Sequence, residues 1–153
     1  MAEDRQLLTD IRLGLRRREL RPVYEVDTDR RRVPTRPGLL FDMGVVSGSR
    51  NLEQAVIMRL LTPRGELSAL GHPEYGSRLH ELIGRQNTET TRNLMKLHIL
   101  ESLQVEPRIE ELVEVIVEPD QVGRDRVNVL LRLKPLGEAG AATIGPFTLE
   151  LAQ

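Results

Sequence analysis

The residues best placed for recognition are a glutamate and an arginine with a proline between them, Glu106-Pro107-Arg108. Proline has no N–H and disfavours the helical conformation in the residue before it, so a helix reaching this point ends by Glu106. On an extended backbone Glu106 and Arg108 then lie two residues apart, on the same side. A carboxylate and a guanidinium held in this way either pair with each other or each bind a complementary group on another chain. The spacing alone leaves both alternatives open.

Carboxylates that suit acid catalysis are scarce in this sequence. Glycoside hydrolysis needs two carboxylates across a cleft, one of them in an apolar pocket that raises its pKa. Glu66, Glu74 and Glu81 lie near expected loops and short helices, but no recognisable spacing ties any of them to a second acid. Aromatic residues make up 3% of the chain and tryptophan is absent, so little surface is available for stacking on sugars. These residues therefore give no support to glycosidase activity.

Metal and nucleophile chemistry finds no support in the sequence. His72, His80 and His98 are too scattered for a metal-binding pair on one helix, and no cysteine supplies a thiolate. The sequence also lacks a Gly-x-Ser-x-Gly elbow and a glycine-rich phosphate loop. We expect neither a metal nor a cofactor.

Length and composition indicate one modest hydrophobic core. The chain has 153 residues, of which 39% are apolar. No apolar run approaches the roughly 18 residues that span a bilayer, and no signal-peptide pattern opens the chain, so we expect synthesis in the cytoplasm without membrane insertion. Residues 1–38 contain ten arginines against seven acidic residues, whereas residues 39–153 are acidic overall. We therefore predict an N-terminal segment over 1–38 and a globular domain over 39–153.

The N-terminal segment is predicted to form a helix followed by an extended arm. Helical spacing of its apolar residues predicts an amphipathic helix from Glu3 to Arg18. Residues 21–38 contain three prolines and the run Arg30-Arg31-Arg32, a composition that favours an extended chain. We expect this arm to dock on neighbouring proteins, with a solvated tail as the alternative. Nucleic-acid binding is disfavoured because acids are interleaved with the arginines and Tyr24 alone offers a stacking ring.

The globular domain is expected to place helices before strands. A first helix follows Asn51 as its cap and ends at Thr62-Pro63, a short one covers Glu74 to Ile83, and a longer one runs from Asn87 or Thr88 to Gln104. Two-residue alternation then predicts strands at 112–118, 127–134 and 147–151. This order indicates an α+β fold: several helices packed on a small antiparallel sheet of about three strands, with an extended N-terminal arm.

Several short motifs occur together in an order that is specific to one family. They are Ser-Gly-Ser-Arg-Asn-Leu-Glu-Gln-Ala-Val at 47–56, Arg-Leu-Leu-Thr at 59–62, Gly-Glu at 65–66, His-Pro-Glu-Tyr-Gly at 72–76 and Glu-Pro-Arg at 106–108. The combination resembles the gene-25-type, lysozyme-like baseplate wedge proteins of contractile phage tails. Related subunits occur in extracellular contractile injection systems and in type VI secretion baseplates. The resemblance spans roughly residues 40 to 152.

The resemblance implies a structural subunit of the inner baseplate, and we expect no enzymatic activity. The lysozyme-like label of the family makes a peptidoglycan-cleaving muramidase, associated with a tail baseplate, the alternative. Glu106, Pro107 and Arg108 would bind the wedge core, and replacing either charged residue by alanine should weaken assembly while leaving the domain folded. The partners would be other wedge proteins, spike or hub proteins and sheath subunits, with six copies per particle and no nucleic acid. After synthesis the protein would join the baseplate of a phage tail or injection particle.

The same resemblance implies that strands of the domain pair with the first ring of sheath subunits. A small sheet has unpaired backbone groups at its edges, and these can bind a strand from another chain. The strand expected to face the sheath is the second one, and Arg132 and Lys134 are expected to guard its edge against random pairing. The candidate residues are Val127, Val129, Leu131, Arg132, Leu133 and Lys134.

Overall fold

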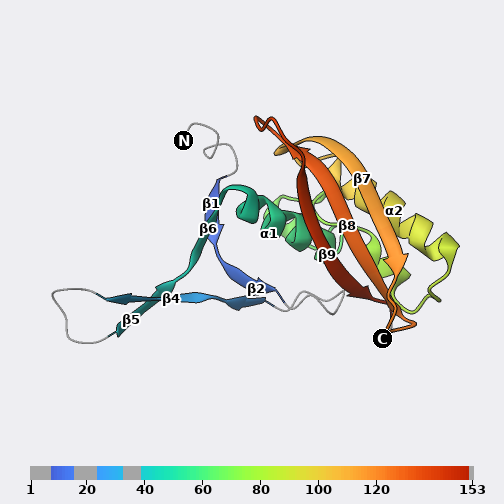
Figure 1. The fold of residues 1–153 in the computed structure, drawn as a ribbon, viewed down its shortest axis with the longest axis horizontal. Helices are drawn as coiled ribbons and strands as arrows, with labels where there is room; N and C mark the ends of the chain where they lie inside the picture. The colour runs from blue at the N-terminus through green and yellow to red at the C-terminus, as the bar shows by residue number, and fades with distance from the viewer. Residues whose placement is uncertain (1–7, 16–23, 33–38, 152–153) are drawn as a thin grey trace.

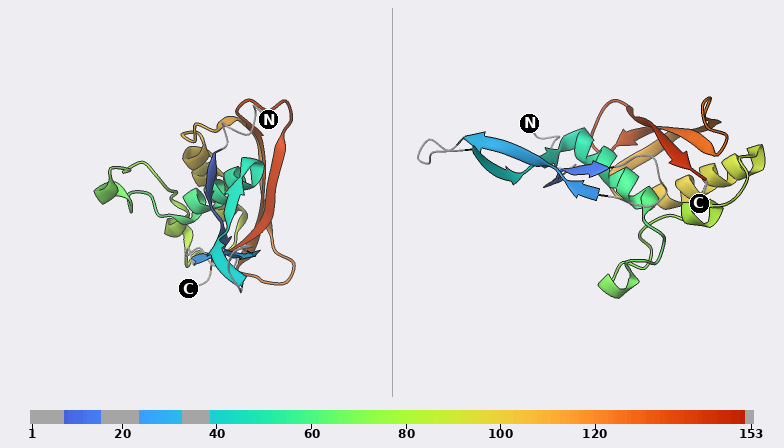
Figure 2. Two further views of the ribbon diagram at one scale, coloured as in Figure 1. Left: turned by 90° about the vertical axis from the view of Figure 1, so that its left-hand side faces the viewer. Right: turned by 90° about the horizontal axis from the view of Figure 1, so that it is seen from below.

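The computed structural model describes residues 8–15, 24–32 and 39–151. Within these ranges the chain forms a body, made of two α-helices and a three-stranded antiparallel sheet, and an arm of short paired strands that projects away from it (Figures 1 and 2). The α+β fold class and the three-stranded sheet are confirmed. The helical content is smaller than expected, since two α-helices are joined by short 3₁₀ turns.

The sheet of the body consists of β7 (Ile109–Pro119), β8 (Arg126–Pro135) and β9 (Ala142–Glu150), in the order β7-β8-β9. Both neighbouring pairs are antiparallel, which follows from the direct connections between consecutive strands. Burial alternates along β8 because every second side chain faces the helices. β8 is therefore the central strand, and β7 and β9 form the two edges of the sheet.

Helix α1 (Gly48–Leu61) begins three residues earlier than the expected cap at Asn51. Ser47 is its N-cap, because the chain passes straight from a paired strand into the helix, and Asn51 lies buried inside the first turns. The C-terminal limit is as expected, with Thr62 as the C-cap and Pro63 unable to continue the helix.

Helix α2 (Glu89–Leu103) is capped by Thr88, whose hydroxyl accepts a hydrogen bond from the Thr91 N–H. One of the two expected caps is thus confirmed. The short helix expected over Glu74 to Ile83 is reduced to a 3₁₀ turn at Leu79–Leu82, and a second 3₁₀ turn lies at Ser68–Leu70. Gly76, with φ of +105°, turns the chain before Leu79 and prevents a continuous helix.

The core lies between the two helices and one face of the sheet. Its fully buried members on α1, α2 and β8 are Leu52, Val56, Leu60, Met95, Ile99, Leu103, Val127, Val129, Leu131 and Leu133. Each such side chain contributes roughly 1.5–3 kcal/mol by leaving water, so this layer is what fixes the sheet on the helices.

The described part of the arm contains six short strands that pair antiparallel in three ribbons. β1 (Thr9–Ile11) pairs with β6 (Val45–Ser47), β2 (Leu13–Leu15) with β3 (Tyr24–Val26), and β4 (Thr28–Arg32) with β5 (Leu39–Met43). The β4–β5 ribbon extends furthest from the body (Figure 1). The pairing continues to Ser47, so the boundary expected at residue 38 falls between two strands of one ribbon.

The helix expected from Glu3 to Arg18 is wrong over residues 9–15, which form strands. Ile11, Leu13 and Leu15 recur at every second position, a strand period, and Gly14 weakens a helix by about 1 kcal/mol. The extended chain expected after residue 21 agrees with β3 and β4. Residues 3–7, 16–23 and 33–38 of these predictions lie outside the described residues.

A ring of three backbone hydrogen bonds joins the ribbons. The N–H of Arg12 donates to the carbonyl of Gly44 (2.7 Å), that of Gly44 to Asp27 (2.8 Å), and that of Asp27 to Arg12 (3.0 Å). Each of these residues lies between two strands that belong to different ribbons. Gln54 of α1 attaches the junction to the body, because its side chain accepts from the Leu13 N–H (2.9 Å) and donates to the Ile11 carbonyl (2.8 Å).

Candidate functional site

The Glu-Pro-Arg corner connects the end of α2 to the start of β7. The N–H of Glu106 donates to the carbonyl of Leu103, and the N–H of Ile109 donates to the carbonyl of Glu106. This turn places the side chain of Glu106 inside the protein, where the residue is 4% exposed. The corner is therefore part of the folded body and not a projecting loop.

Two arginines surround the carboxylate of Glu106. Oε1 accepts from Nε of Arg108 at 2.6 Å, and Oε2 accepts from Nε and Nη2 of Arg59 at 3.2 and 3.0 Å. Glu106 and Arg108 thus pair with each other, the first of the two alternatives left open by their spacing. Because Glu106 is buried, replacing it removes an internal contact, so the expectation of an undisturbed fold after Glu106→Ala is not supported by this geometry.

Arg59, in the last turn of α1, is the member of the cluster that sequence reasoning missed. Its guanidinium carbon lies 4.5 Å from the ring centre of Tyr75, an arrangement that stabilises a cation on the aromatic face. The signal available in the sequence was a lone arginine between apolar residues of a core helix, since Leu60 and Leu61 follow it directly. Such an arginine requires a buried partner.

Burial alone would raise the pKa of the Glu106 carboxyl, but the hydrogen bond and charge of Arg108, together with those of Arg59, outweigh it. The pKa of Glu106 therefore lies below its usual range. A carboxylate in this state is a fixed negative charge and a poor proton donor at neutral pH.

Arg108 differs from its partners in being nearer the surface. Within the described residues it bonds through Nε, and its side chain is 20% exposed. The terminal nitrogens of the guanidinium can therefore donate to a group on another chain while Glu106 holds the side chain in one orientation.

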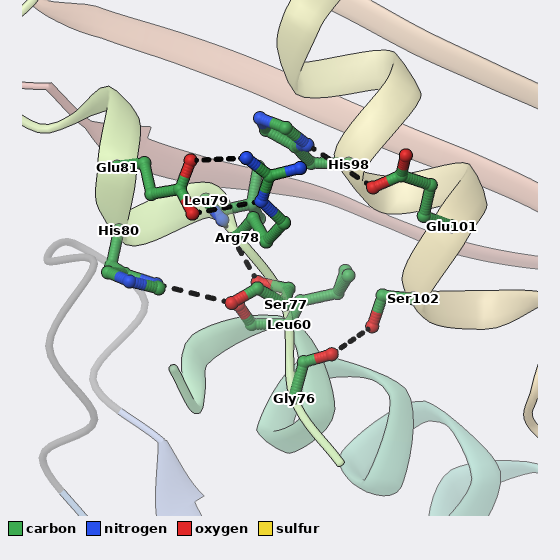
Figure 3. A network of polar contacts seen from close by, with 10 residues as sticks. All are labelled: Leu60, Gly76, Ser77, Arg78, Leu79, His80, Glu81, His98, Glu101 and Ser102. Atoms are coloured by element: carbon green, nitrogen blue, oxygen red, sulfur yellow. Dashed lines mark hydrogen bonds and ion pairs between the residues drawn. The ribbon is translucent and has the colours of Figure 1, made fainter. Parts of the chain in front are cut away.

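The carboxylates considered for catalysis lie apart from this cluster. Glu74 forms an ion pair with Arg64, and Glu81 binds Arg78 through two hydrogen bonds of 2.9 Å (Figure 3). The hydrogen bond from Arg78 lowers the pKa of Glu81, the opposite of what a general acid needs. Glu66 is exposed. The structure does not bring these three acids into an apolar pocket.

The three histidines do not take part in the hydrogen bonds of the Glu106 carboxylate either. His98 is buried on α2, with Nδ1 at 3.5 Å from Oε2 of Glu101, and Nδ1 of His80 lies 3.2 Å from the carbonyl of Ser77 (Figure 3). His72 is exposed on the 68–73 loop. Among the described residues, no group of three or more histidines, aspartates and glutamates is arranged to hold a metal ion.

The prediction that Arg132 and Lys134 guard a sheet edge is wrong, because β8 is paired on both sides. Lys134 instead bonds Glu110 of β7 at 2.9 Å, and Arg132 bonds Glu114 at 3.4 Å. The apolar members of the same set cannot face a sheath subunit, since their side chains fill the core. They are Val127, Val129, Leu131 and Leu133, all fully buried.

Among the helices that the structure describes, none is long and apolar enough to cross a membrane.

No protein-family model matches the chain, and no curated protein is detectably similar to it. A solved structure does match, that of a candidate tail lysozyme from Geobacter sulfurreducens, with a TM-score of 0.54 and 23% sequence identity. The two chains share a fold. The matched region covers 62% of this chain and 84% of the Geobacter chain.

Proposed function

We propose that this protein is a structural subunit of the baseplate of a contractile tail or contractile injection system, joining the wedge core to the inner baseplate and to the start of the sheath. The observation that carries the proposal is the corner at 106–108, where Glu106 fixes the partly exposed Arg108 at the junction of α2 and β7. The fold shared with a candidate tail lysozyme supports an origin among tail proteins.

The wedge contact would run through Arg108. Its guanidinium is already oriented by Glu106, so a partner carboxylate or carbonyl binds it with little further loss of side-chain entropy. Glu106 and Arg59 would act behind it by holding that orientation. Pro107 sets the direction of the chain between them. The site proposed from the sequence is thus retained, with the direct contact assigned to Arg108.

The sheath contact would use an edge of the three-stranded sheet. Among the strands that the structure describes, β7 and β9 each pair on one side only, and an extended segment of a sheath subunit can add to such an edge by backbone hydrogen bonds. β8 cannot form this contact, because it is paired with β7 on one side and β9 on the other. We therefore assign the sheath contact to β7 or β9, in place of the central strand β8 that the sequence indicated.

A non-enzymatic role is part of the proposal. Cleavage of peptidoglycan needs a carboxylic acid that keeps its proton near neutral pH. Glu81 and the buried Glu106 are instead ion-paired with arginines and have lowered pKa values. The muramidase remains the alternative because the structural neighbour is named for a tail lysozyme.

The test is a pull-down of the tagged full-length chain from the producing cells, with mass spectrometry of the recovered proteins. Recovery of wedge, hub or sheath proteins is expected for the wild type, a loss is expected for Arg108→Ala, and no change is expected for the exposed control Arg85→Ala. Recovery that is the same in all three would remove the assignment of Arg108. Release of soluble fragments from purified peptidoglycan by the wild type would favour the muramidase.

A further inference from the structure

A small pocket lies between the chain at 74–78 and the second half of α2 (Figure 3). Its volume is about 20 Å³, which is room for about one group of the size of a water molecule. The chain at 74–78 is fixed against the helices, because the hydroxyl of Ser102 donates to the carbonyl of Gly76 at 2.9 Å and that of Ser77 donates to the carbonyl of Leu60 at 2.5 Å. The pocket is therefore ordered before anything binds in it.

The charges at the pocket do not cancel. Arg64 and Glu74 line it and pair with each other, and Arg78 lines it and pairs with Glu81. Glu101 is the remaining lining carboxylate, and among the described residues its ion-pair partner is a histidine and not an arginine or a lysine. With that histidine neutral, three glutamates stand against two arginines, a net charge of −1. The pocket thus favours a cation over an anion.

His98 lines the same pocket and has a buried nitrogen without a partner. Its side chain is 7% exposed, and within the part of the chain that the structure describes Nδ1 makes no hydrogen bond. Oε2 of Glu101 lies 3.5 Å from it, farther than a normal hydrogen bond. Buried polar atoms are rarely left unpaired, so this nitrogen indicates a missing group. A single donor atom can lie about 2.9 Å from both Nδ1 and Oε2.

We propose that the pocket binds the ammonium group of a lysine side chain from another protein. An ammonium is compact and positive, and it has three N–H donors, of which one reaches Nδ1 of His98 and another Oε2 of Glu101. A guanidinium is a planar fork with five donors and needs more room than one water-sized space. A carboxylate or phosphate would bring a second negative charge to acceptors that lack a donor.

The surface beside the pocket suits the rest of a lysine side chain. Val105 lines the pocket and is 58% exposed, so it can cover the methylene groups that follow the ammonium. This apolar contact distinguishes a lysine from a free ammonium ion. The inference uses neither Arg108 nor the sheet edges, and it does not depend on the proposed baseplate role.

The first test titrates the full-length chain, labelled with ¹⁵N in its histidines, with n-butylammonium chloride and follows the His98 Nδ1 resonance by NMR. The titration is run at about pH 8, above the range in which imidazoles ordinarily take up a proton. A shift that saturates is expected. Tetramethylammonium has the same charge and no N–H group, so it is the matched control and should give no saturating shift.

Variants test the contact with Glu101. Glu101→Gln should raise the dissociation constant of n-butylammonium at least about tenfold, since the charge that faces the ammonium is removed. Glu118→Gln, at an exposed position on β7, should leave it unchanged. Circular dichroism shows whether Glu101→Gln keeps the fold. If the fold is lost, Glu74→Gln makes the same measurement, because it frees the positive charge of Arg64 at the pocket.

The second test identifies the source of the ammonium in complexes recovered from the producing cells. A carbodiimide joins a carboxylate to an amine in contact with it, with loss of water, so Glu101 is expected to form an amide with a lysine of a different protein. Four results would overturn the proposal: no saturating shift with n-butylammonium, an equal shift with tetramethylammonium, a dissociation constant unaffected by Glu101→Gln, or Glu101 left uncoupled or coupled to a second copy of this chain.

Discussion

Nη2 of Arg59 lies 3.0 Å from Oε2 of Glu106, although 47 residues separate the two in the sequence. The contact ties the last turn of α1 to the corner between α2 and β7. Glu106 is thereby the internal counter-charge of two arginines, one buried and one partly exposed.

Replacing Glu106 by glutamine is expected to lower the free energy of unfolding by roughly 3–5 kcal/mol, since Arg59 then keeps its buried charge without a counter-charge. The measurement is urea unfolding at neutral pH, followed by circular dichroism. Glu118→Gln, at an exposed position on β7, is the control and should stay near the wild type. A Glu106→Gln curve that overlays the wild type would show that the buried ion pair contributes nothing to stability.

The contribution of Glu106 should disappear in acid. An unfolded glutamate has a pKa of about 4.3, and the pKa in the folded protein is lower. Below about pH 5 the unfolded chain therefore takes up a proton that the folded protein does not, so this part of the stability is complete at neutral pH and falls as the pH drops through the folded-state pKa. Urea unfolding of wild type and Glu106→Gln from pH 7 to pH 3 should show the two stabilities converging; a constant difference would contradict the assignment.

Gly76 and Gly71 both have positive φ angles but should respond differently to alanine. A Cβ at Gly71 meets nothing within 4 Å, so Gly71→Ala should cost only the backbone strain of about 1–2 kcal/mol. A Cβ at Gly76 would lie 2.5 Å from the carbonyl oxygen of Thr62, so the loop must also move, and Gly76→Ala should cost about 3 kcal/mol or more. Thermal and urea unfolding of both variants provides the comparison, and equal losses would contradict it.

Gln54→Ala should loosen the arm while leaving the body intact. It removes two hydrogen bonds, each worth about 0.5–1.5 kcal/mol, that connect α1 to the backbone on both sides of Arg12. Hydrogen exchange of the Leu13 amide should become faster, whereas amides of β8 should keep their protection. Gln86→Ala, at an exposed site, is the control. Unchanged exchange at Leu13 would mean that the arm is held by other contacts.

The body of the protein follows closely from its sequence because its signals are local. The alternation of Val127, Val129, Leu131 and Leu133 identifies a strand with one buried face, and Thr88 identifies the start of α2. Alternation does not reveal which neighbours a strand has. Consequently the sequence placed β8 at an edge, and Arg132 and Lys134 received a role that belongs to cross-strand pairing with Glu114 and Glu110.

In the arm and at the Glu-Pro-Arg corner, contacts between residues far apart in the sequence could not be predicted from local patterns. Ile11 and Leu15 have helical spacing, whereas Leu13 between them completes a strand period, and the choice depends on partners more than ten residues away. The pairing of Glu106 with Arg108 is within reach of sequence reasoning because they are two residues apart. Arg59 joins them through tertiary packing alone, which the spacing of charges along the chain does not express.

Three segments of the chain, β1–β2, β3–β4 and β5–β6, each pass through the junction and contribute one strand to each of two ribbons, so the arm cannot be shortened in steps. Removing everything before residue 38 takes away the partners of both β5 and β6, leaving two unpaired strands directly ahead of α1. A protein truncated at that point would expose the unpaired backbone groups of β5 and β6, which can pair with strands of other molecules and cause aggregation. A form of this protein that dispensed with its arm would therefore have to begin at Gly48, where the helix itself starts.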